Sequence, residues 1–209
     1  DSDRRSLRMV ATDGHRLATA DADIDVDSLA GLEKGIIIPR KGLSEIRKNL
    51  EGIAEEVSIG VQQGMCVVKT DGITLKISLI DAEYPDYRRV MPSEKGMEVR
   101  FEKDKVLHSL RRMSVISSDN YQGVIVKLFE NRMVLNSTNP DVGEANDEID
   151  VVYNGKEVDF AYNVNFLIDA IEVVDSKEVI FEIGGAKKPA IIRSAENSDY
   201  YCIIMPLKY

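Results

Sequence analysis

Two parts of this sequence repeat one another, and this duplication limits the possible folds more than any other feature of the chain. Arg8–Val10 matches Arg132–Val134. Glu56–Ile59 likewise matches Glu178–Phe181. The matched segments lie roughly 120 residues apart, much farther than the units of a solenoid, so the sequence indicates duplication of a whole domain. The second half has an additional front part over Met97–Phe129, and we expect that truncation at the N-terminus explains its absence from the first half.

Hydrophobic periodicity predicts three helices among many strands. The expected helices span residues 41–52, 103–114 and 164–174. The expected strands span residues 7–11, 15–20, 35–39, 56–61, 65–70, 73–79, 97–101, 123–129, 133–137, 158–162, 178–183, 190–194 and 200–205. No strand is predicted for the acidic stretch 141–150, and prolines interrupt a linker at 81–94. This pattern indicates an α+β fold of antiparallel sheets with helices on one face of each sheet.

Composition excludes several classes of protein. Of the 209 residues, 44% are hydrophobic and 30% are charged, which predicts one or two globular domains. The net charge of −9 argues against a protein that coats nucleic acid, although local basic surfaces remain possible. No apolar run is long enough to span a membrane and no leader opens the chain, so we expect a cytoplasmic protein without a membrane partner. Cys66 and Cys202 are far apart and predict two buried, reduced thiols.

The segment Arg8–Ala18 reads RMVATDGHRLA and predicts a hairpin that turns at Asp-Gly. A His, an Arg and a Leu leave this turn together, where a hairpin usually carries small polar residues. One interpretation is catalytic, with Asp13 and His15 as an oriented base and Thr12 as nucleophile; the other is the rim of a binding pocket. Residues in one tight hairpin rarely converge on a substrate, and no phosphate loop, HExxH motif or metal-ligand cluster accompanies them. We therefore expect a protein that is not an enzyme and uses no cofactor or metal.

Four segments, RMVATDGHRLA, IIIPRKG, YPDYRRVMP and YYCIIMPLKY, occur in this order. Together they resemble the family of the bacterial sliding clamp, the beta subunit of the replicative DNA polymerase III, over essentially the whole chain. The resemblance implies the DNA-clamp fold and a ring of two protomers, each with three similar domains, around duplex DNA. Residues 1–94 would then hold the latter part of the middle domain and a linker, and residues 95–209 the complete C-terminal domain. A processivity factor that tethers polymerase to DNA without reading its sequence is the implied function.

The sequence departs from the family pattern in two places. The first domain and the front of the second are absent, so a chain of this length should not close a ring by itself. The chain also ends Met-Pro-Leu-Lys-Tyr, where the family often ends Met-Pro-Met-Arg or similar, which affects the expected rim of the binding pocket.

The resemblance implies a hydrophobic pocket between the second and third domains. In the family, the replicative polymerase, the clamp loader and repair proteins insert a short peptide there. Position by position, its lining would be Thr12, Gly14, His15, Arg16, Leu17, Pro85, Arg89, Val90, Ile203, Met205 and Pro206. A few anchor side chains would carry most of the affinity, and Met suits a shared docking site. Alternatively, the apolar members are inter-domain core and His15 is a turn histidine bonded to backbone.

Two of the expected helices carry basic residues opposite their apolar stripes. The expected DNA-facing residues are Arg40, Lys41, Arg47, Lys48, Lys105 and Arg112, with His108 on the same stripe as the last two. A sliding protein needs sequence-independent attraction to phosphates, which a few long cationic side chains supply. A solvated amphipathic face is the alternative. The third helix carries Asp169, Glu172 and Asp175, so its charge predicts no DNA contact.

The resemblance also implies a surface that closes the ring of a full-length homodimer. Val115 and Ile116 would pack against the first domain of a partner protomer, and Glu144, Asp147 and Glu148 could form the acidic side of that interface. Alternatively, the two apolar residues are core residues at a helix end and the acids belong to a solvated loop. A peptide-binding interaction module without a role on DNA is the alternative function.

Overall fold

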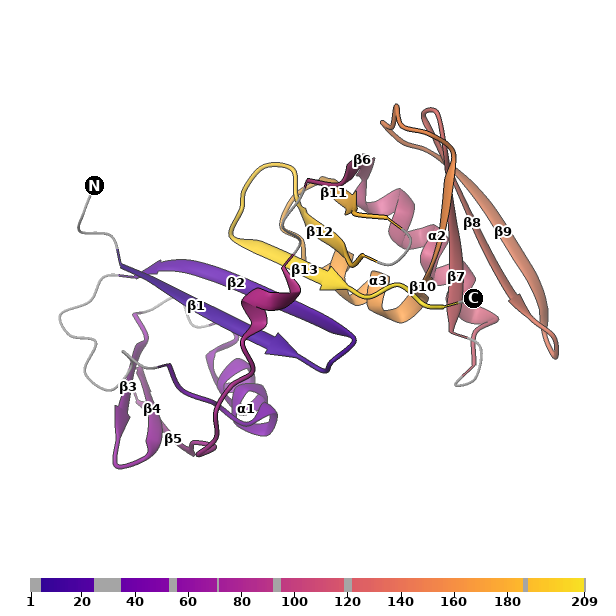
Figure 1. Ribbon diagram of the computed structural model, residues 1–209. Helices are drawn as coiled ribbons and strands as arrows, with labels where there is room; N and C mark the ends of the chain where they lie inside the picture. The colour runs from indigo at the N-terminus through magenta and orange to yellow at the C-terminus, as the bar shows by residue number, and fades with distance from the viewer. Residues whose placement is uncertain are drawn as a thin grey trace. The chain divides into compact units, whose positions relative to one another are not determined.

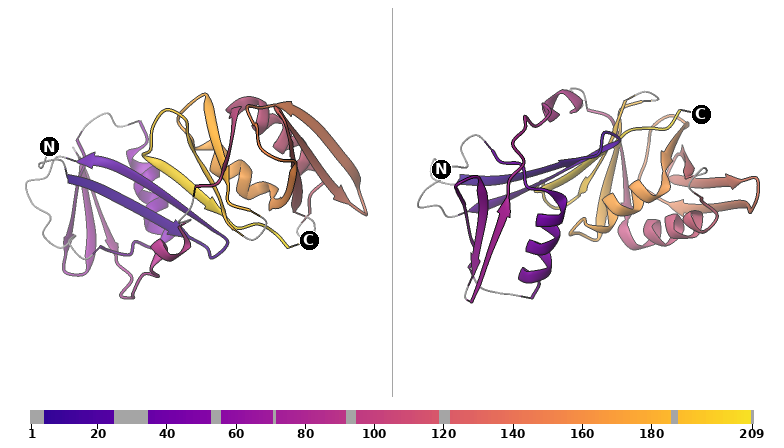
Figure 2. Two further views of the ribbon diagram at one scale, coloured as in Figure 1. Left: turned by 45° about the horizontal axis from the view of Figure 1, so that its top comes forward. Right: turned by 90° about the horizontal axis from the view of Figure 1, so that it is seen from below.

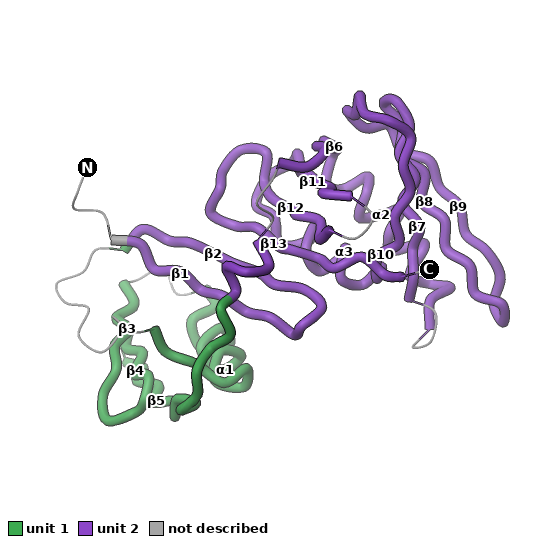
Figure 3. Tube along the Cα trace, viewed as in Figure 1, with its two compact units in different colours: residues 1–5, 24–86 green, residues 6–23, 87–209 purple. Residues whose placement is uncertain are grey.

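The computed structural model describes residues 5–24, 35–52, 56–70, 72–91, 95–118, 122–185 and 188–208. The chain divides into two compact units, coloured separately in Figure 3. The smaller unit contains residues 1–5 and 24–86, and the larger unit contains residues 6–23 and 87–209. The hairpin near the N-terminus thus belongs with the C-terminal half.

The larger unit contains two sheets (Figure 1). The first has six strands in the order β1 (Arg5–Thr12), β2 (Arg16–Ile24), β13 (Tyr200–Ile204), β12 (Ala190–Ser194), β11 (Glu178–Ile183) and β6 (Met97–Glu102). The second has four antiparallel strands in the order β10 (Val158–Asn163), β7 (Gly123–Phe129), β8 (Arg132–Asn139) and β9 (Gly143–Asp150). A short 3₁₀ helix, η1 (Tyr87–Val90), precedes β6.

Two helices of the larger unit, α2 (Lys103–Val115) and α3 (Val164–Glu172), lie side by side and each contacts both sheets (Figure 2). The stripe of α2 predicted to be apolar is buried and ends at Met113, which is 1% exposed. Asn163 caps α3, because its side chain accepts hydrogen bonds from the backbone N–H groups of Asn165 and Phe166. One continuous core joins residues from both helices and both sheets, which gives this unit a rigid frame.

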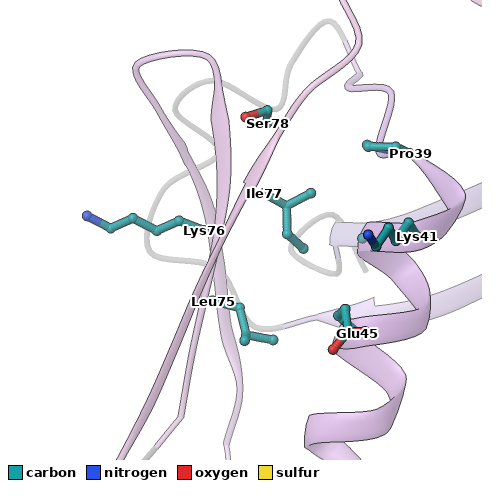
Figure 4. A pocket seen from close by; sticks show the side chains of 8 residues that line it. Pro39, Lys41, Glu45, Leu75, Lys76, Ile77 and Ser78 are labelled. Carbon is teal, nitrogen blue, oxygen red and sulfur yellow. The ribbon is translucent and has the colours of Figure 1, made fainter.

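The smaller unit has one helix, α1 (Arg40–Leu50), and a three-stranded antiparallel sheet of β3 (Ser58–Gln62), β4 (Met65–Thr70) and β5 (Ile73–Ser78). Among its described residues, the buried hydrophobic side chains are Cys66, Val67 and Val68. Between α1 and β5 lies an open groove of about 460 Å³, with Leu75 and Ile77 pointing toward the helix (Figure 4). This unit therefore has far less interior than the larger one.

Several predicted elements differ from the structure. Residues 35–39 form no strand, although Ile37 accepts a backbone hydrogen bond from Ile80 at 2.9 Å. The acidic stretch 141–150 contains strand β9, paired with β8 along its whole length. Strand β2 continues to Ile24, four residues past its predicted end. Ile53, which continues the apolar spacing of the helix expected over 41–52, lies outside the described residues.

The prediction of two buried, reduced thiols is confirmed, because both cysteines are buried and unpaired. Burial raises the pKa of Cys66, and it raises the pKa of Cys202 to about 11. No helix in the described part of the chain is long and apolar enough to cross a membrane. The described residues also contain no group of three His, Cys, Asp or Glu side chains that could hold a metal ion.

Candidate functional site

The pairing of β2 with β13 places the hairpin next to the C-terminal strand, and Figure 1 shows these strands, far apart in sequence, side by side. Leu17 lies opposite Ile203 in the antiparallel ladder, and both side chains are buried. The ladder continues past β13, since the backbone N–H of Met205 donates to the carbonyl of His15 at 3.0 Å. The ladder thus fixes the predicted pocket residues at positions 15–17 beside two others, Ile203 and Met205, that come almost 190 positions later.

The turn itself is held by its own side chains. Asp13 Oδ1 accepts hydrogen bonds from the backbone N–H groups of His15 and Arg16, both at 3.0 Å. The Thr12 hydroxyl donates to the carbonyl of Arg16 at 2.8 Å and accepts from the N–H of Gly14 at 3.2 Å. Gly14 has φ of +86°, a conformation that glycine adopts without steric cost. Asp13 and Thr12 therefore build the turn, which does not fit their interpretation as orienter and nucleophile.

The two residues that leave the turn contact helix α3. The ring of His15 stacks on Phe166 with 6.4 Å between centroids, and the guanidinium carbon of Arg16 lies 4.4 Å from the centre of the same ring. Arg16 donates from Nη1 to Asp169 Oδ2 at 2.6 Å and from Nε to Asp13 Oδ2 at 3.1 Å. Phe166 and Asp169 are three residues apart and share one face of α3.

These contacts shift the pKa values of the charged groups. Partial burial disfavours the charge on Arg16, but the hydrogen bonds to Asp169 and Asp13 outweigh burial and raise the pKa of the guanidinium. Burial alone would raise the pKa of Asp13, whereas the hydrogen bonds from His15 and Arg16 lower it below its ordinary value. Arg16 is therefore a cation held between two carboxylates, which accept hydrogen bonds from its Nε and Nη1 atoms.

Phe166 and Asp169 are members of the site that sequence reasoning missed. They lie 150 or more residues from the hairpin and on a helix set aside because of its acidic residues. The available signal was their spacing of three on a helix that Asn163 caps, directly after a buried strand. Below them, the Tyr200 hydroxyl donates to the carbonyl of Ala170 at 3.2 Å, and burial raises the pKa of this tyrosine.

Apolar side chains remain exposed at this end of the unit. Met205 is 41% exposed and Val90 is 44% exposed. The Tyr201 hydroxyl donates to the sulfur of Met91 at 3.5 Å, which places the chain just after η1, the helix containing Arg89 and Val90, next to β13. The predicted pocket residue Pro206 is half-buried, and Pro85 belongs to the smaller unit. The larger unit thus brings together most of the predicted pocket residues and leaves apolar surface accessible on them.

The predicted DNA-facing residues divide between the two units. On α1 of the smaller unit, Arg40, Lys41, Arg47 and Lys48 are all exposed, and among the described residues no ion pair joins them to a carboxylate. On α2 of the larger unit, Lys105 pairs with Glu102 at 2.7 Å, which raises the pKa of the lysine. Arg112 pairs with Asp147 of β9. The cations of α2 are exposed but partly neutralised by neighbours.

The predicted protomer surface lies at the end of α2 and on β9. Val115 is 80% exposed, so the interpretation of this residue as core is wrong. Ile116 is half-buried, and its carbonyl accepts a hydrogen bond from Asn139 at 2.7 Å. Glu144, Asp147 and Glu148 lie on strand β9 and not in a loop. Asp147 binds Arg112, and Glu148 lies 3.5 Å from Arg132, so both acids already have cationic neighbours within the chain.

Comparisons with known proteins all match this chain to members of one family. Residues 88–208 match the family model of the DNA polymerase III beta subunit, C-terminal domain, and residues 1–86 match that of its central domain. The Beta sliding clamp of Pseudomonas aeruginosa is 30% identical over 203 residues, which are 97% of this chain and 55% of that protein. The Beta sliding clamp of Escherichia coli K12 is 26% identical over 208 residues, all of this chain and 56% of that protein.

Solved structures agree. A DnaN sliding clamp from Bartonella birtlesii bound to griselimycin superimposes with a TM-score of 0.91 at 30% identity, covering 98% of this chain and 55% of that one. The DNA polymerase III subunit beta from Pseudomonas aeruginosa gives a TM-score of 0.90 at 30% identity, with 97% and 55% covered. The chain spans about half the length of the curated relatives that it matches.

Proposed function

This chain belongs to the family of the DNA polymerase III beta subunit, the bacterial sliding clamps, and from that premise we propose that it is part of a processivity factor of DNA replication. Such a protein forms a ring around duplex DNA and tethers the replicative polymerase, the clamp loader and repair proteins through short peptides. It catalyses no reaction and acts in the cytoplasm. Residues 1–94 contribute the latter part of the middle domain with a linker, and residues 95–209 contribute the C-terminal domain.

The observation that carries the peptide site is the ladder between β2 and β13. It sets buried Leu17 opposite Ile203 and leads directly into exposed Met205, so a rigid backbone supports an accessible apolar surface. Interfaces gain most of their affinity from a few apolar or aromatic anchors that enter such a surface. The contact of His15 and Arg16 with Phe166 adds an aromatic wall to it.

Titration of the whole chain with griselimycin, the ligand of the Bartonella clamp, tests this site. Truncation of exposed lining residues in Val90→Ala and Met205→Ala should each weaken binding roughly five- to thirtyfold, as lost anchor contacts do. The matched control is Val142→Ala, which removes a 64% exposed valine from the β8–β9 turn and should leave the affinity unchanged. Equal affinity for all four proteins would refute the site.

The exposed cations of α1 support a role on DNA, because they can attract phosphates without reading bases. We expect weak binding of this chain to duplex DNA that is independent of sequence and falls steeply with salt. Reversal of Lys41 and Lys48 to glutamate should reduce that binding and the slope of its salt dependence. Reversal of Lys127, an exposed lysine of β7, serves as the control.

One observation favours the alternative function. Lys105 and Arg112 of α2 are both paired with carboxylates of the chain, so only part of the predicted cationic surface is available to phosphates. If the chain does not bind duplex DNA while griselimycin still binds, the chain is a peptide-binding module without a role on DNA.

We also propose that the exposed end of α2 and strand β9 form the surface that closes the ring in the full-length homodimer. The support is the 80% exposure of Val115, together with the ion pair between Arg112 of α2 and Asp147, which holds this end of the helix against the acidic strand β9. Contiguous exposed apolar and charged groups of this kind are typical of a subunit interface.

A further inference from the structure

The loop between β9 and β10 carries the one Asn-Gly pair in the sequence, Asn154 and Gly155, and both residues are exposed. The chain is fixed on each side of this pair. The Tyr153 carbonyl accepts a hydrogen bond from the N–H of Asn131 at 2.8 Å, and the Tyr153 hydroxyl donates to the carbonyl of Lys156 at 2.6 Å. Between these two contacts, no hydrogen bond within the described part of the chain engages the N–H of Gly155. The Gly155 nitrogen is therefore available to react with the side chain that precedes it.

The ring of Tyr153 requires glycine at position 155. A Cβ atom there would overlap the hydroxyl oxygen of Tyr153 and lie 2.5 Å from its Cζ atom. Tyr153 is 2% exposed and packs in the continuous core, so it cannot move aside. Because glycine has no Cβ, nothing shields its own nitrogen from attack on a neighbouring group. The packing of this loop thus preserves the residue that makes the preceding asparagine reactive.

We propose that Asn154 is a site of spontaneous modification, at which its side-chain amide is converted to a carboxylate. The Gly155 nitrogen loses its proton to hydroxide and attacks Asn154 Cγ. The new C–N bond closes a cyclic succinimide, the bond from Cγ to Nδ2 breaks, and the amide leaves as ammonia after taking a proton from water. A water molecule then opens the ring at either carbonyl, which gives aspartate or isoaspartate. The loop gains a negative charge in both cases, and no oxidant or reductant is needed.

Two other positions show what prevents the same chemistry elsewhere in the chain. Asn163 is followed by Val164, whose N–H donates to the carbonyl of Gln122 at 2.9 Å. Gly14 follows an acidic residue, but its N–H donates to the Thr12 hydroxyl at 3.2 Å. In both places the nitrogen that would attack is held by a hydrogen bond, whereas the loop at 154 combines exposure, a following glycine and an unengaged N–H.

Ageing of the whole chain at mildly alkaline pH tests the proposal. Native isoelectric focusing should show a more acidic species that accumulates with time, and mass spectrometry of its peptides should locate the change at Asn154. The rate should lie within about tenfold of the rate in an end-blocked synthetic peptide Tyr-Asn-Gly-Lys, because the fold does not have to open first. A slower rate would show that the fold protects this bond, and it would overturn the proposal.

Two matched variants locate the reaction. Asn154→Gln keeps an amide at the position but places it one carbon farther from the backbone, where ring closure is disfavoured, so the acidic species should not form. The control is Asn197→Gln, since Asn197 is also exposed but is followed by Ser198. This variant should age at the unsubstituted rate. If Asn154→Gln aged normally, or if Asn197→Gln did not age, the reactive site would lie elsewhere and the proposal would fail.

The two products should differ in stability. Isoaspartate extends the backbone by one carbon between Tyr153 and Gly155, which disturbs the hydrogen bond from the Tyr153 hydroxyl to the carbonyl of Lys156. The isoaspartate form, separated by chromatography, should melt about 1–3 °C below the variant Asn154→Asp, which carries the same charge on an unaltered backbone. Equal melting temperatures would overturn this effect on the loop.

Discussion

His15, Arg16 and Leu17 could be identified from the sequence because a hairpin turn is determined by residues that are neighbours in the chain. The Asp-Gly pair fixes the turn, and the residues after it can be read directly as leaving it. Phe166 and Asp169 could not be found in this way, because their part in the site depends on a long-range approach of α3 to the hairpin. The same limit applied to the charge of Arg16, which the sequence shows as a cation and the structure shows between two carboxylates.

A second ion pair of the hairpin gives a prediction for pH. Arg8 binds Asp21 through two hydrogen bonds of 2.7 Å, and this contact lowers the pKa of the carboxyl. A carboxyl whose pKa is lower in the folded than in the unfolded chain stabilises the fold above its unfolded value, about 3.9, and loses this effect as the pH falls through the folded value. Asp21→Asn should therefore lower the melting temperature by about 1–3 °C near pH 6, with the difference closing below about pH 4.

Thermal unfolding followed by circular dichroism, from about pH 2.5 to about pH 7, would measure this difference. In a chain that already carries Arg8→Gln, the further change Asp21→Asn should have no effect at any pH, because the partner is gone. A difference that persists in that background, or that grows in acid, would contradict the assignment.

At the scale of elements, the misses have distinct causes. Strand β9 has exposed acidic side chains at Glu144 and Glu148, and acids are depleted in strands, so its sequence does not look like one; its pairing with β8 overrides that preference. The run Gly35–Pro39 shows the reverse. It is apolar enough for a strand, but a strand needs a ladder of hydrogen bonds, and Ile37 is its one residue with such a bond in the described part of the chain. In both cases, pairing with a distant segment decides whether a strand forms, and hydrophobic periodicity does not reveal that pairing.

Helix α1 gives a prediction about close packing. A methyl group at Gly42 would come within 2.5 Å of the Ile77 Cγ2 atom of β5. Alanine is the better helix former by about 1 kcal/mol, but overpacking costs about 1–3 kcal/mol, so Gly42→Ala should leave the smaller unit no more stable and up to about 2 kcal/mol less stable.

Urea unfolding of the smaller unit would measure this change. In a chain that carries Ile77→Ala, which removes the opposing Cγ2 methyl group, Gly42→Ala should cost less stability than it does in the unsubstituted chain. If Gly42→Ala stabilises the protein by the full propensity difference, the contact with β5 is looser than the structure shows.

At the scale of the whole molecule, the duplication recognised in the sequence appears as a repeated order of elements. Strands β1 and β2, helix α1 and strands β3–β5 correspond to β8 and β9, α3 and β11–β13, while β10 has no counterpart strand among the described residues of the first half. The sequence did not show that the hairpin would join the six-stranded sheet of the larger unit. That outcome depends on the pairing of Leu17 with Ile203, residues that belong to different copies of the repeat.

The two units should unfold separately in calorimetry. The continuous core belongs to the larger unit, whereas the smaller unit has three buried hydrophobic side chains among its described residues, so it should melt at the lower temperature. Val68→Ala should lower only the first transition, and Leu135→Ala only the second, each by an amount that reflects about 2–4 kcal/mol of lost packing. A single transition that both substitutions shift equally would show that the units unfold together.

The ladder between β2 and β13 has a mechanical consequence. Five residue pairs, from Ala20 with Tyr200 to Arg16 with Ile204, connect the hairpin to the C-terminal strand. A force that acts along the strands therefore loads all of these hydrogen bonds at once and does not break them one after another. A peptide bound at the proposed site beside this ladder would therefore have a stiff support, and under load it should be released before the two strands separate.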